Sequence, residues 1–242
     1  MSRESLLAKT MVELADTLVD NFDVVDLLTT LSQRCVEVLD VAAAGIMLVS
    51  PAGDLRAMTW SNEAMRIVEL FEQQAEEGPC LDCYRSGEAI VNHDLTAAGD
   101  RWPNFAPVAV DAGLRAADAV PLRLRGTVIG ALNLFRSEPS PLDADDVAIA
   151  QALADIATVA ILQHRALTRA EAVNDQLNRA LRSRVIIEQA MGMISEHLRI
   201  DVDEAFHLLR NHARNHNELL SDTAAAITEG SRTPQDLDRP RR

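Results

Sequence analysis

Arginine side chains stand in two groups in the last third of the chain. Arg182 and Arg184 lie close together, and Arg210 and Arg214 are four residues apart, which is the spacing of side chains on one face of a helix. The planar guanidinium group of arginine fits phosphate and stacks on unpaired bases. These four residues are therefore candidates for contacts with nucleic acid, and the alternative interpretation is a charged face that contacts only water.

Cys80 and Cys83 form the one motif with redox chemistry. Two thiols three residues apart in the first turn of a helix could have lowered pKa values and close into a disulfide, which would make the surrounding domain a redox sensor. The alternative is that Cys80 is packed in the interior and Cys83 has no role. Ligation of a metal or haem is disfavoured, because the pair lacks a second pair of cysteines and no histidine follows it directly.

The sequence does not predict a metal site or an enzyme. His212 and His216 have the spacing of two zinc ligands on one helix face, but no third ligand is near them in sequence, which favours a partly exposed histidine face instead. Neither a catalytic triad, a phosphate-binding loop nor a paired-carboxylate site is visible. We therefore expect no catalytic residues and no cofactor, although a small-molecule ligand of unknown kind stays open for the first domain.

Composition and charge limit where a nucleic acid could bind. The chain of 242 residues is 48% hydrophobic, which is enough for one sizeable core and a second small unit. The net charge of −14 lies entirely within residues 1–164, and the remainder is neutral. Any contact with phosphate must therefore come from a local arginine face. Without a signal peptide or an apolar run of membrane-spanning length, we expect a cytoplasmic protein with no membrane partner.

The first part of the chain has the pattern of an α+β layer. We expect two helices in 6–39, a hairpin of 42–49 with 55–60, a helix at 62–75 and a helical turn at 80–85, then an irregular stretch at 92–107 and a hairpin of 120–124 with 128–135. The order of these elements, with Val120-Pro121-Leu122 followed by Gly126-Thr127-Val128-Ile129-Gly130, resembles a GAF domain. The resemblance implies a sensor domain over residues 1–165.

A long helix is expected to follow this domain, from Asp143 to about Glu196. A heptad register over 143–181 predicts a coiled-coil seam through which two copies would form a homodimer. Its residues are Ile149, Leu153, Ile156, Leu167, Asn174 and Leu177. Asn174 is a buried polar position that favours a parallel pair of helices. The alternative is that residues 143–165 simply pack against the sheet.

Three short helices are expected in residues 174–230. Asp201 and Glu204 have the spacing of a capping box at the start of a helix that ends near His216. Asn217 or Ser221 then caps a last helix, which Gly230 stops. Residues 231–242, with two prolines and mixed charge, are expected to be disordered.

This helical module resembles an ANTAR domain, a small RNA-binding antiterminator fold. The residues that carry the resemblance are Arg184, Ile187, Ala190, Gly192, Asp203, Glu204, Ala205, Phe206, Leu208, Leu209, Arg210, Ala213 and Arg214. The resemblance implies that Arg182, Arg184, Arg210 and Arg214 contact RNA. The family often has a lysine where this chain has Met191, so one basic contact is absent.

Taken together, the two resemblances imply a signal-responsive regulator that binds two adjacent hairpins in a nascent leader RNA and prevents transcription termination. A homodimer would present two binding units to the paired hairpins. The input would be a small molecule, a protein partner or a redox change. Two other functions stay open, namely a protein-interaction or signalling module and a DNA-binding transcription regulator, because three helices can imitate a helix-turn-helix.

Overall fold

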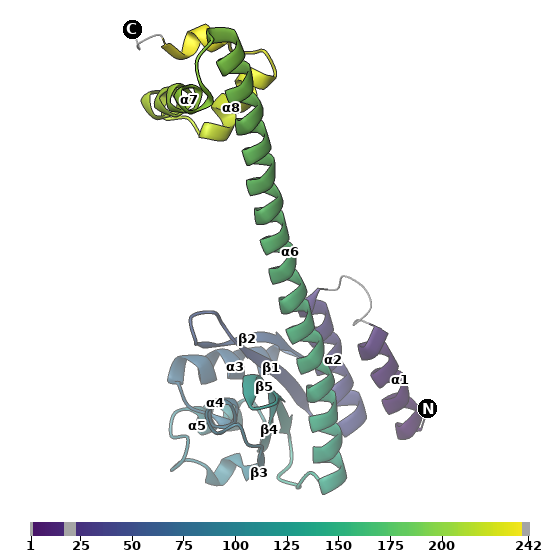
Figure 1. Cartoon of the computed structure of the whole chain (residues 1–242). Coiled ribbons are helices and arrows are strands. Elements are labelled where there is room, and N and C mark those ends of the chain that lie inside the picture. The colour runs from purple at the N-terminus through teal and green to yellow at the C-terminus, as the bar shows by residue number, and fades with distance from the viewer. Residues whose placement is uncertain (1, 17–22, 239–242) are drawn as a thin grey trace. The chain divides into compact units, whose positions relative to one another are not determined.

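The computed structural model describes residues 2–16 and 23–238 (Figure 1). The chain divides into two compact units, Met1–Ala166 and Leu167–Arg242, which we call the first unit and the second unit. One helix, α6 (Ala144–Leu198), contributes residues to both. Each unit has a hydrophobic core of its own.

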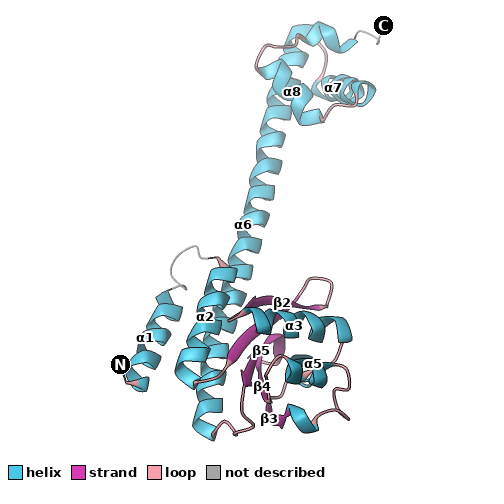
Figure 2. Cartoon of the chain, turned by 180° about the vertical axis from the view of Figure 1, so that it is seen from behind, coloured by secondary structure: helices cyan, strands magenta, loops and turns pink. Residues whose placement is uncertain are grey.

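The first unit is built on an antiparallel sheet with the strand order β2-β1-β5-β4-β3 (Figure 2). The strands are β1 (Ala43–Val49), β2 (Leu55–Trp60), β3 (Ile90–Asp94), β4 (Ala116–Leu124) and β5 (Thr127–Arg136). The β4–β5 hairpin turns through Arg125 and Gly126, whose φ angles of 47° and 87° are the positive values that a tight hairpin turn requires. Both hairpins expected from the sequence are confirmed.

Helices cover both faces of this sheet (Figures 1 and 2). On one face lie α2 (Val24–Leu39) and the first part of α6, and α1 (Arg3–Asp16) packs beside α2. On the other face lie α3 (Glu63–Ala75), α4 (Pro79–Ser86) and α5 (Phe105–Asp111). Side chains of β1 point alternately to the two faces of the sheet. Ile46 and Leu48 pack with residues of α2 and α6, whereas Met47 packs with residues of α4. The expected α+β fold class is confirmed.

The stretch 92–107 is more regular than expected. It contains the end of β3, a single 3-10 turn (Leu95–Ala97) and the start of α5. The alternation typical of a strand is broken in β3, because Asn92 has a φ of 57° and the pairing with β4 shifts between Ile90 and His93. A helix as short as α5 gives too few turns for a periodic pattern.

The long helix α6 is continuous, and the Asp143 carboxylate accepts a hydrogen bond of 2.8 Å from the Asp146 amide at its start. The first half of the expected seam packs within the first unit, as in the alternative interpretation of residues 143–165. Leu153 is fully buried, and Ile149 and Ile156 are half-buried against the core of the first unit, so these apolar positions pack on the chain's own sheet. Residues 165–182 are all exposed, and they include the remaining seam positions Leu167, Asn174 and Leu177.

By length and composition alone, α6 could cross a membrane, which corrects the expectation that no segment has this character. The structure gives the apolar side chains in the first part of α6 another role. Leu153, Ala157 and Ile161 are fully buried in the core of the first unit.

The second unit consists of the end of α6, α7 (Val202–His216), α8 (Leu220–Thr228) and a 3-10 helix, η2 (Pro234–Asp238). The Asp201 carboxylate caps α7 by accepting a 2.7 Å hydrogen bond from the Glu204 amide, as expected. The expected cap of α8 is wrong. Asn217 instead ends α7 in the left-handed conformation, with a φ of 55°, and Leu219 precedes α8 without a side-chain cap.

The tail is ordered over residues 231–238, against the expectation of disorder. Leu237 of η2 is 6% exposed and packs with Ile194, Leu209 and Ile227 in the core of the second unit. Arg232 donates hydrogen bonds of 2.7 and 3.0 Å to the two carboxylate oxygens of Glu218. An apolar contact, an ion pair and hydrogen bonds from Ser231 and Arg232 to the Ala226 carbonyl therefore hold the tail. Residues 239–242 lie outside the described part of the chain.

Candidate nucleic-acid interface

Helix α7 has one face in the core and one face in solvent. Ala205, Leu209 and Ala213 are buried, while Arg210 and Arg214 are exposed one turn apart. Among the described residues, neither arginine has an ion-pair partner. Two hydrated guanidinium groups with free donors are suited to holding phosphate oxygens.

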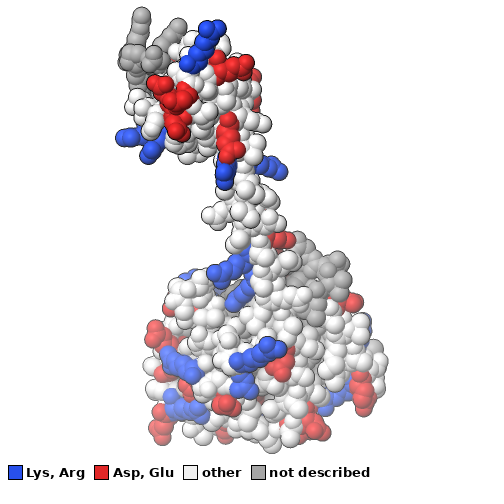
Figure 3. Space-filling view, in the orientation of Figure 1, with Lys and Arg blue, Asp and Glu red and all other residues white. Residues whose placement is uncertain are grey.

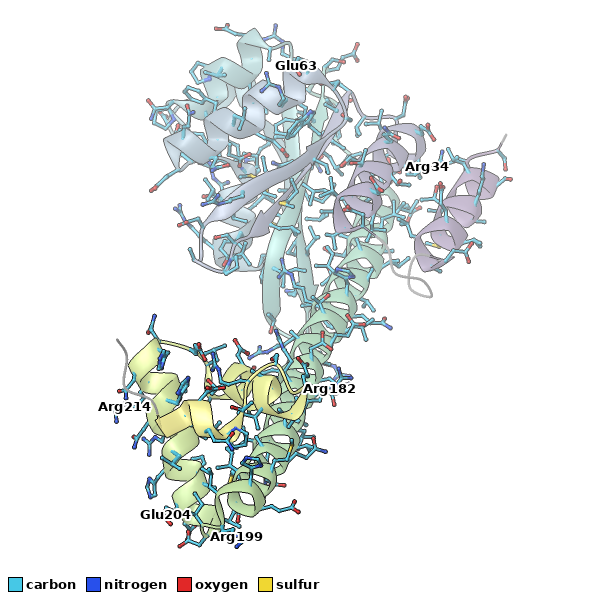
Figure 4. The ribbon with its side chains drawn as sticks, turned by 90° about the horizontal axis from the view of Figure 1, so that it is seen from above. Arg34, Glu63, Arg182, Arg199, Glu204 and Arg214 are labelled. Atoms are coloured by element: carbon cyan, nitrogen blue, oxygen red, sulfur yellow. The ribbon has the colours of Figure 1, made fainter. Side chains whose placement is uncertain are left out.

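The other two candidate arginines do not complete this surface. Residues two positions apart in a helix point about 200° apart, so Arg182 and Arg184 lie on different faces of α6. Seen as in Figure 4, Arg182 and Arg214 point to opposite sides of the second unit. The structure therefore brings together Arg210 and Arg214 but does not join all four arginines in one patch.

The surroundings of Arg184 and Arg182 also differ from those of the α7 arginines. Arg184 pairs with Glu188 at 2.8 Å, and this carboxylate raises the pKa of the guanidinium above its usual value. Arg182 lies with Arg179 beside a shallow hollow that Asp175 and Asn178 also line. On the face drawn in Figure 3, basic and acidic side chains are interspersed over the second unit, so any attraction for phosphate is local.

His212 and His216 stack with ring centroids 4.0 Å apart and an interplanar angle of 17°. His212 is buried, which corrects the expectation of a partly exposed histidine face, and neither of its ring nitrogens has a partner in the described structure. Burial, followed by the charges of His216 and Arg232, lowers the pKa of His212. Within the described residues, no three side chains are grouped to hold a metal ion.

The cysteine pair lacks the chemistry expected of a redox site. Cys80 and Cys83 are free and fully buried. Burial raises the pKa of the Cys83 thiol to about 12 and that of Cys80 well above its ordinary value, where a reactive thiol needs the opposite shift. The expected lowering of the thiol pKa is therefore wrong, because the start of α4 is enclosed by the sheet.

Sequence reasoning missed a buried carboxylate pair on α3. Glu69 and Glu72 are fully buried, and Glu72 accepts hydrogen bonds from the Cys80 amide at 2.7 Å and from the Asn133 side chain at 3.0 Å. Both oxygens of Glu69 and the Asn133 side-chain oxygen have no partner in the described structure. A β-carbon added at Gly45 would collide with the Glu69 carboxylate, so the absence of a side chain at Gly45 leaves room for this carboxylate.

The pair has a clear electrostatic consequence. Burial, and then the neighbouring charge of Glu72, raises the pKa of Glu69 well above its usual range. Burial raises the pKa of Glu72 to about 8. The sequence spacing could have indicated that the pair is buried. Glu69 and Glu72 follow Met65 by four and seven residues, so they lie on the apolar stripe of α3.

The first unit also has a surface hollow of about 320 Å³ between β2, α3 and α4. Leu55 and Leu81 are its apolar lining, and Arg56, Tyr84 and Arg85 are among its polar residues. These groups offer both apolar and charged contacts to a small molecule.

Comparison with known proteins agrees with the division into two units. The GAF domain family model matches residues 23–162, and the ANTAR domain family model matches residues 175–227. Among curated proteins, none matches the chain.

Solved structures share the fold of the first unit. The free methionine-R-sulfoxide reductase from Neisseria meningitidis is 20% identical, with a TM-score of 0.53 over 69% of this chain and 95% of that one. GAF domains of phosphoenolpyruvate-protein phosphotransferases are also similar. The one from Acinetobacter is 15% identical, with a TM-score of 0.53 over 70% of this chain and 99% of that one. The one from Coxiella burnetii is 15% identical, with a TM-score of 0.52 over 69% and 99%.

These likenesses show the fold alone, whereas the family matches show the ancestry of both units. The chain therefore belongs to the GAF domain family and carries an ANTAR domain after its GAF domain.

Proposed function

We propose that this protein is a signal-responsive transcription antitermination regulator that binds hairpins in nascent leader RNA. The coarser assignment, a signal-sensing regulator with an RNA-binding output domain, follows from the GAF and ANTAR domains. These are sensor and regulatory families rather than catalytic ones, so we propose no enzymatic activity. A cytoplasmic location fits a protein that acts on nascent transcripts.

The exposed pair Arg210 and Arg214 is the observation that supports RNA as the target. Both lie within the segment that the ANTAR family model matches, and neither has an acidic partner among the described residues. In contrast, the exposed arginine Arg184 is already paired with Glu188. We propose that Arg210 and Arg214 make the main phosphate contacts, with Arg182 and Arg184 adding weaker contacts from α6.

We also propose that a second copy of the chain covers the exposed part of α6. Leu167, Leu177 and Leu181 are more than half exposed, and a helix in this state gains stability by pairing its apolar stripe. Asn174, in the same stripe, accepts a 3.0 Å hydrogen bond from the Asn178 side chain. A dimer would carry two output domains, which would raise the effective concentration at the second hairpin.

The RNA proposal is tested by filter binding of the full chain to a paired-hairpin RNA at several salt concentrations. We expect Arg210→Ala with Arg214→Ala to lower affinity at least tenfold and to reduce the salt slope by about 2, because two phosphate contacts are lost. Arg169→Ala, which removes an exposed charge from α6, is the matched control and should change little.

Three outcomes would contradict this proposal. Unchanged affinity in the double variant would rule out the α7 surface. Equal competition by duplex DNA would favour a DNA-binding regulator. Absence of salt-sensitive retention in the parent chain would favour a protein-interaction module.

The dimer is tested by sedimentation of a Leu177→Glu variant. We expect a monomer that binds a paired-hairpin RNA no better than a single-hairpin RNA, because a buried charge disrupts the seam and removes the second binding unit. Glu171→Gln, at an exposed position outside the seam, is the control. A parent chain that sediments as a monomer would remove this part of the proposal.

A further inference from the structure

The exposed face of α7 carries amide side chains beside its arginines. Asn211 and Asn215 are both exposed and stand four residues apart, as Arg210 and Arg214 do. The helical repeat therefore makes two adjacent rows on this face, one of guanidinium groups and one of carboxamides. Successive members of each row are about 6 Å apart along the helix axis.

These amides have no structural task in the described part of the chain. Neither Asn211 nor Asn215 makes a side-chain hydrogen bond there, in contrast to Asn133 in the first unit, which binds Glu72 at 3.0 Å. Asparagine also has a lower helix propensity than alanine, so an exposed helix position gains no local stability from it. Free donors and acceptors at these two positions are available for a ligand.

The charge of the surroundings favours an anionic ligand. Between Ala205 and Asn217 the chain has arginines and histidines but no acidic residue. The next acidic side chain, Glu218, is neutralised by Arg232 at 2.7 Å and accepts a hydrogen bond from Thr223 at 3.0 Å. A polyanion can therefore approach this face without repulsion from α7 beyond its first turn.

Arginine and asparagine suit different parts of RNA. A guanidinium group binds phosphate, which fixes position without reading sequence. A carboxamide presents two donors and one acceptor, which can pair with the edge of a base. In a hairpin loop the bases are unstacked, and their edges are open to side chains.

We propose that Asn211 and Asn215 are the residues that read the base sequence of the hairpin loop, while Arg210 and Arg214 hold the adjacent phosphates. This inference rests on the proposed RNA-binding function and goes beyond it, since it assigns selectivity to the uncharged row. Because the two amides are one helical turn apart, each reads a different base.

The test uses the full chain and a set of hairpin RNAs in which each loop position is changed in turn to all four bases. For the parent we expect preferences of about tenfold or more at two or more loop positions. Asn211→Ala and Asn215→Ala should each reduce the preference at a different position to about twofold or less. Arg210→Ala should instead weaken all loops alike and reduce the salt slope by about 1.

Gln176→Ala is the matched control, because it removes an exposed amide from α6 in the same unit. Alanine at an exposed helix position keeps the fold, which circular dichroism verifies. The Asn211→Gln variant keeps the amide group but moves it by one methylene, so it tests whether the position of the amide matters. If both asparagine variants keep every base preference of the parent, this inference is overturned while the proposed function stands. If the parent retains no hairpin RNA at low salt, the proposed function fails and the inference falls with it.

Discussion

The Glu69–Asn133 cluster of the first unit and the α7 surface of the second unit both contain polar groups without partners, but these two sets lie in opposite environments. In the first unit, the Glu69 carboxylate and the Asn133 side-chain oxygen are fully buried. In the second unit, Arg210, Arg214 and Asn211 are exposed to water. Water satisfies an exposed group until a ligand replaces it, whereas a buried group must be satisfied from within or neutralised.

This difference determines what each set of groups can do. A buried carboxyl that takes up a proton becomes neutral, and its O–H can then donate to an oxygen such as that of Asn133. Burial raises the pKa of Glu69 and of Glu72, which favours this neutral, protonated form. The exposed guanidinium groups have donors that are available to a polyanion.

The largest effect that we expect from this comparison is a loss of stability of the first unit with rising pH. Because burial raises the folded-state pKa of Glu72 from 4.5 to about 8, its stability contribution is full below about pH 4.5 and is lost as the pH rises through about 8. We expect the free energy of unfolding to fall by on the order of 3 kcal/mol between pH 5 and pH 8. Urea unfolding followed by tryptophan fluorescence measures this unit alone, because Trp60 and Trp102 are its only tryptophans and the second unit has none.

A double variant, Glu69→Gln with Glu72→Gln, provides the decisive comparison. The amides keep the size of the side chains and remove the titration, so the unfolding free energy of the variant should be nearly independent of pH over this range. A parent chain that is as stable at pH 8 as at pH 5 would show that the buried pair remains charged and is satisfied in another way.

The next effect concerns the small core of the second unit. Leu237→Ala should lower its unfolding free energy by about 2 kcal/mol, because a side chain that is 6% exposed leaves a cavity among Ile194, Leu209 and Ile227. Far-ultraviolet circular dichroism detects the unfolding of this helical unit, which tryptophan fluorescence does not report.

Leu219→Ala is the matched control, since the Leu219 side chain is 68% exposed and its loss should change stability by less than about 0.5 kcal/mol. Equal effects of the two substitutions would mean that η2 does not pack against the second unit in solution.

Much of the architecture was predictable because it depends on local pattern. The helical period identified α2, α3 and α6, and alternation identified the two hairpins. Asp143 and Asp201 cap helices where their positions before an apolar run predicted it. Local hydrogen bonds and side-chain periodicity are properties of a single segment, so a sequence alone can reveal them.

The misses share one cause, because each depends on which segments meet in space. Leu153 falls on an apolar stripe that serves equally for a coiled coil and for packing on a sheet, and only the fold chooses between them. Leu237 is a single apolar residue in a polar tail, too little to reveal that it completes a core.

The smallest effect that we expect is the pH dependence of the Arg232–Glu218 ion pair, which has the opposite sign to that of the first unit. Hydrogen bonds from Arg232, followed by the one from Thr223, lower the pKa of Glu218 to about 2. Its contribution is therefore present above about pH 4.5 and is lost as the pH falls toward 2, which is opposite in sign to the buried pair of the first unit. The side chains of Arg232 and Glu218 are 26% and 32% exposed, so solvent screening limits the pair to about 1 kcal/mol or less.

Arg232→Ala should lower the stability of the second unit by this amount at pH 7 and by less at pH 3, as circular dichroism would measure. Arg184→Ala, which breaks the more exposed pair with Glu188, should have no measurable effect at either pH. If Arg232→Ala destabilised the unit equally at both pH values, the ion pair would contribute nothing, and the apolar contact of Leu237 and the hydrogen bonds to the Ala226 carbonyl would hold the tail in place.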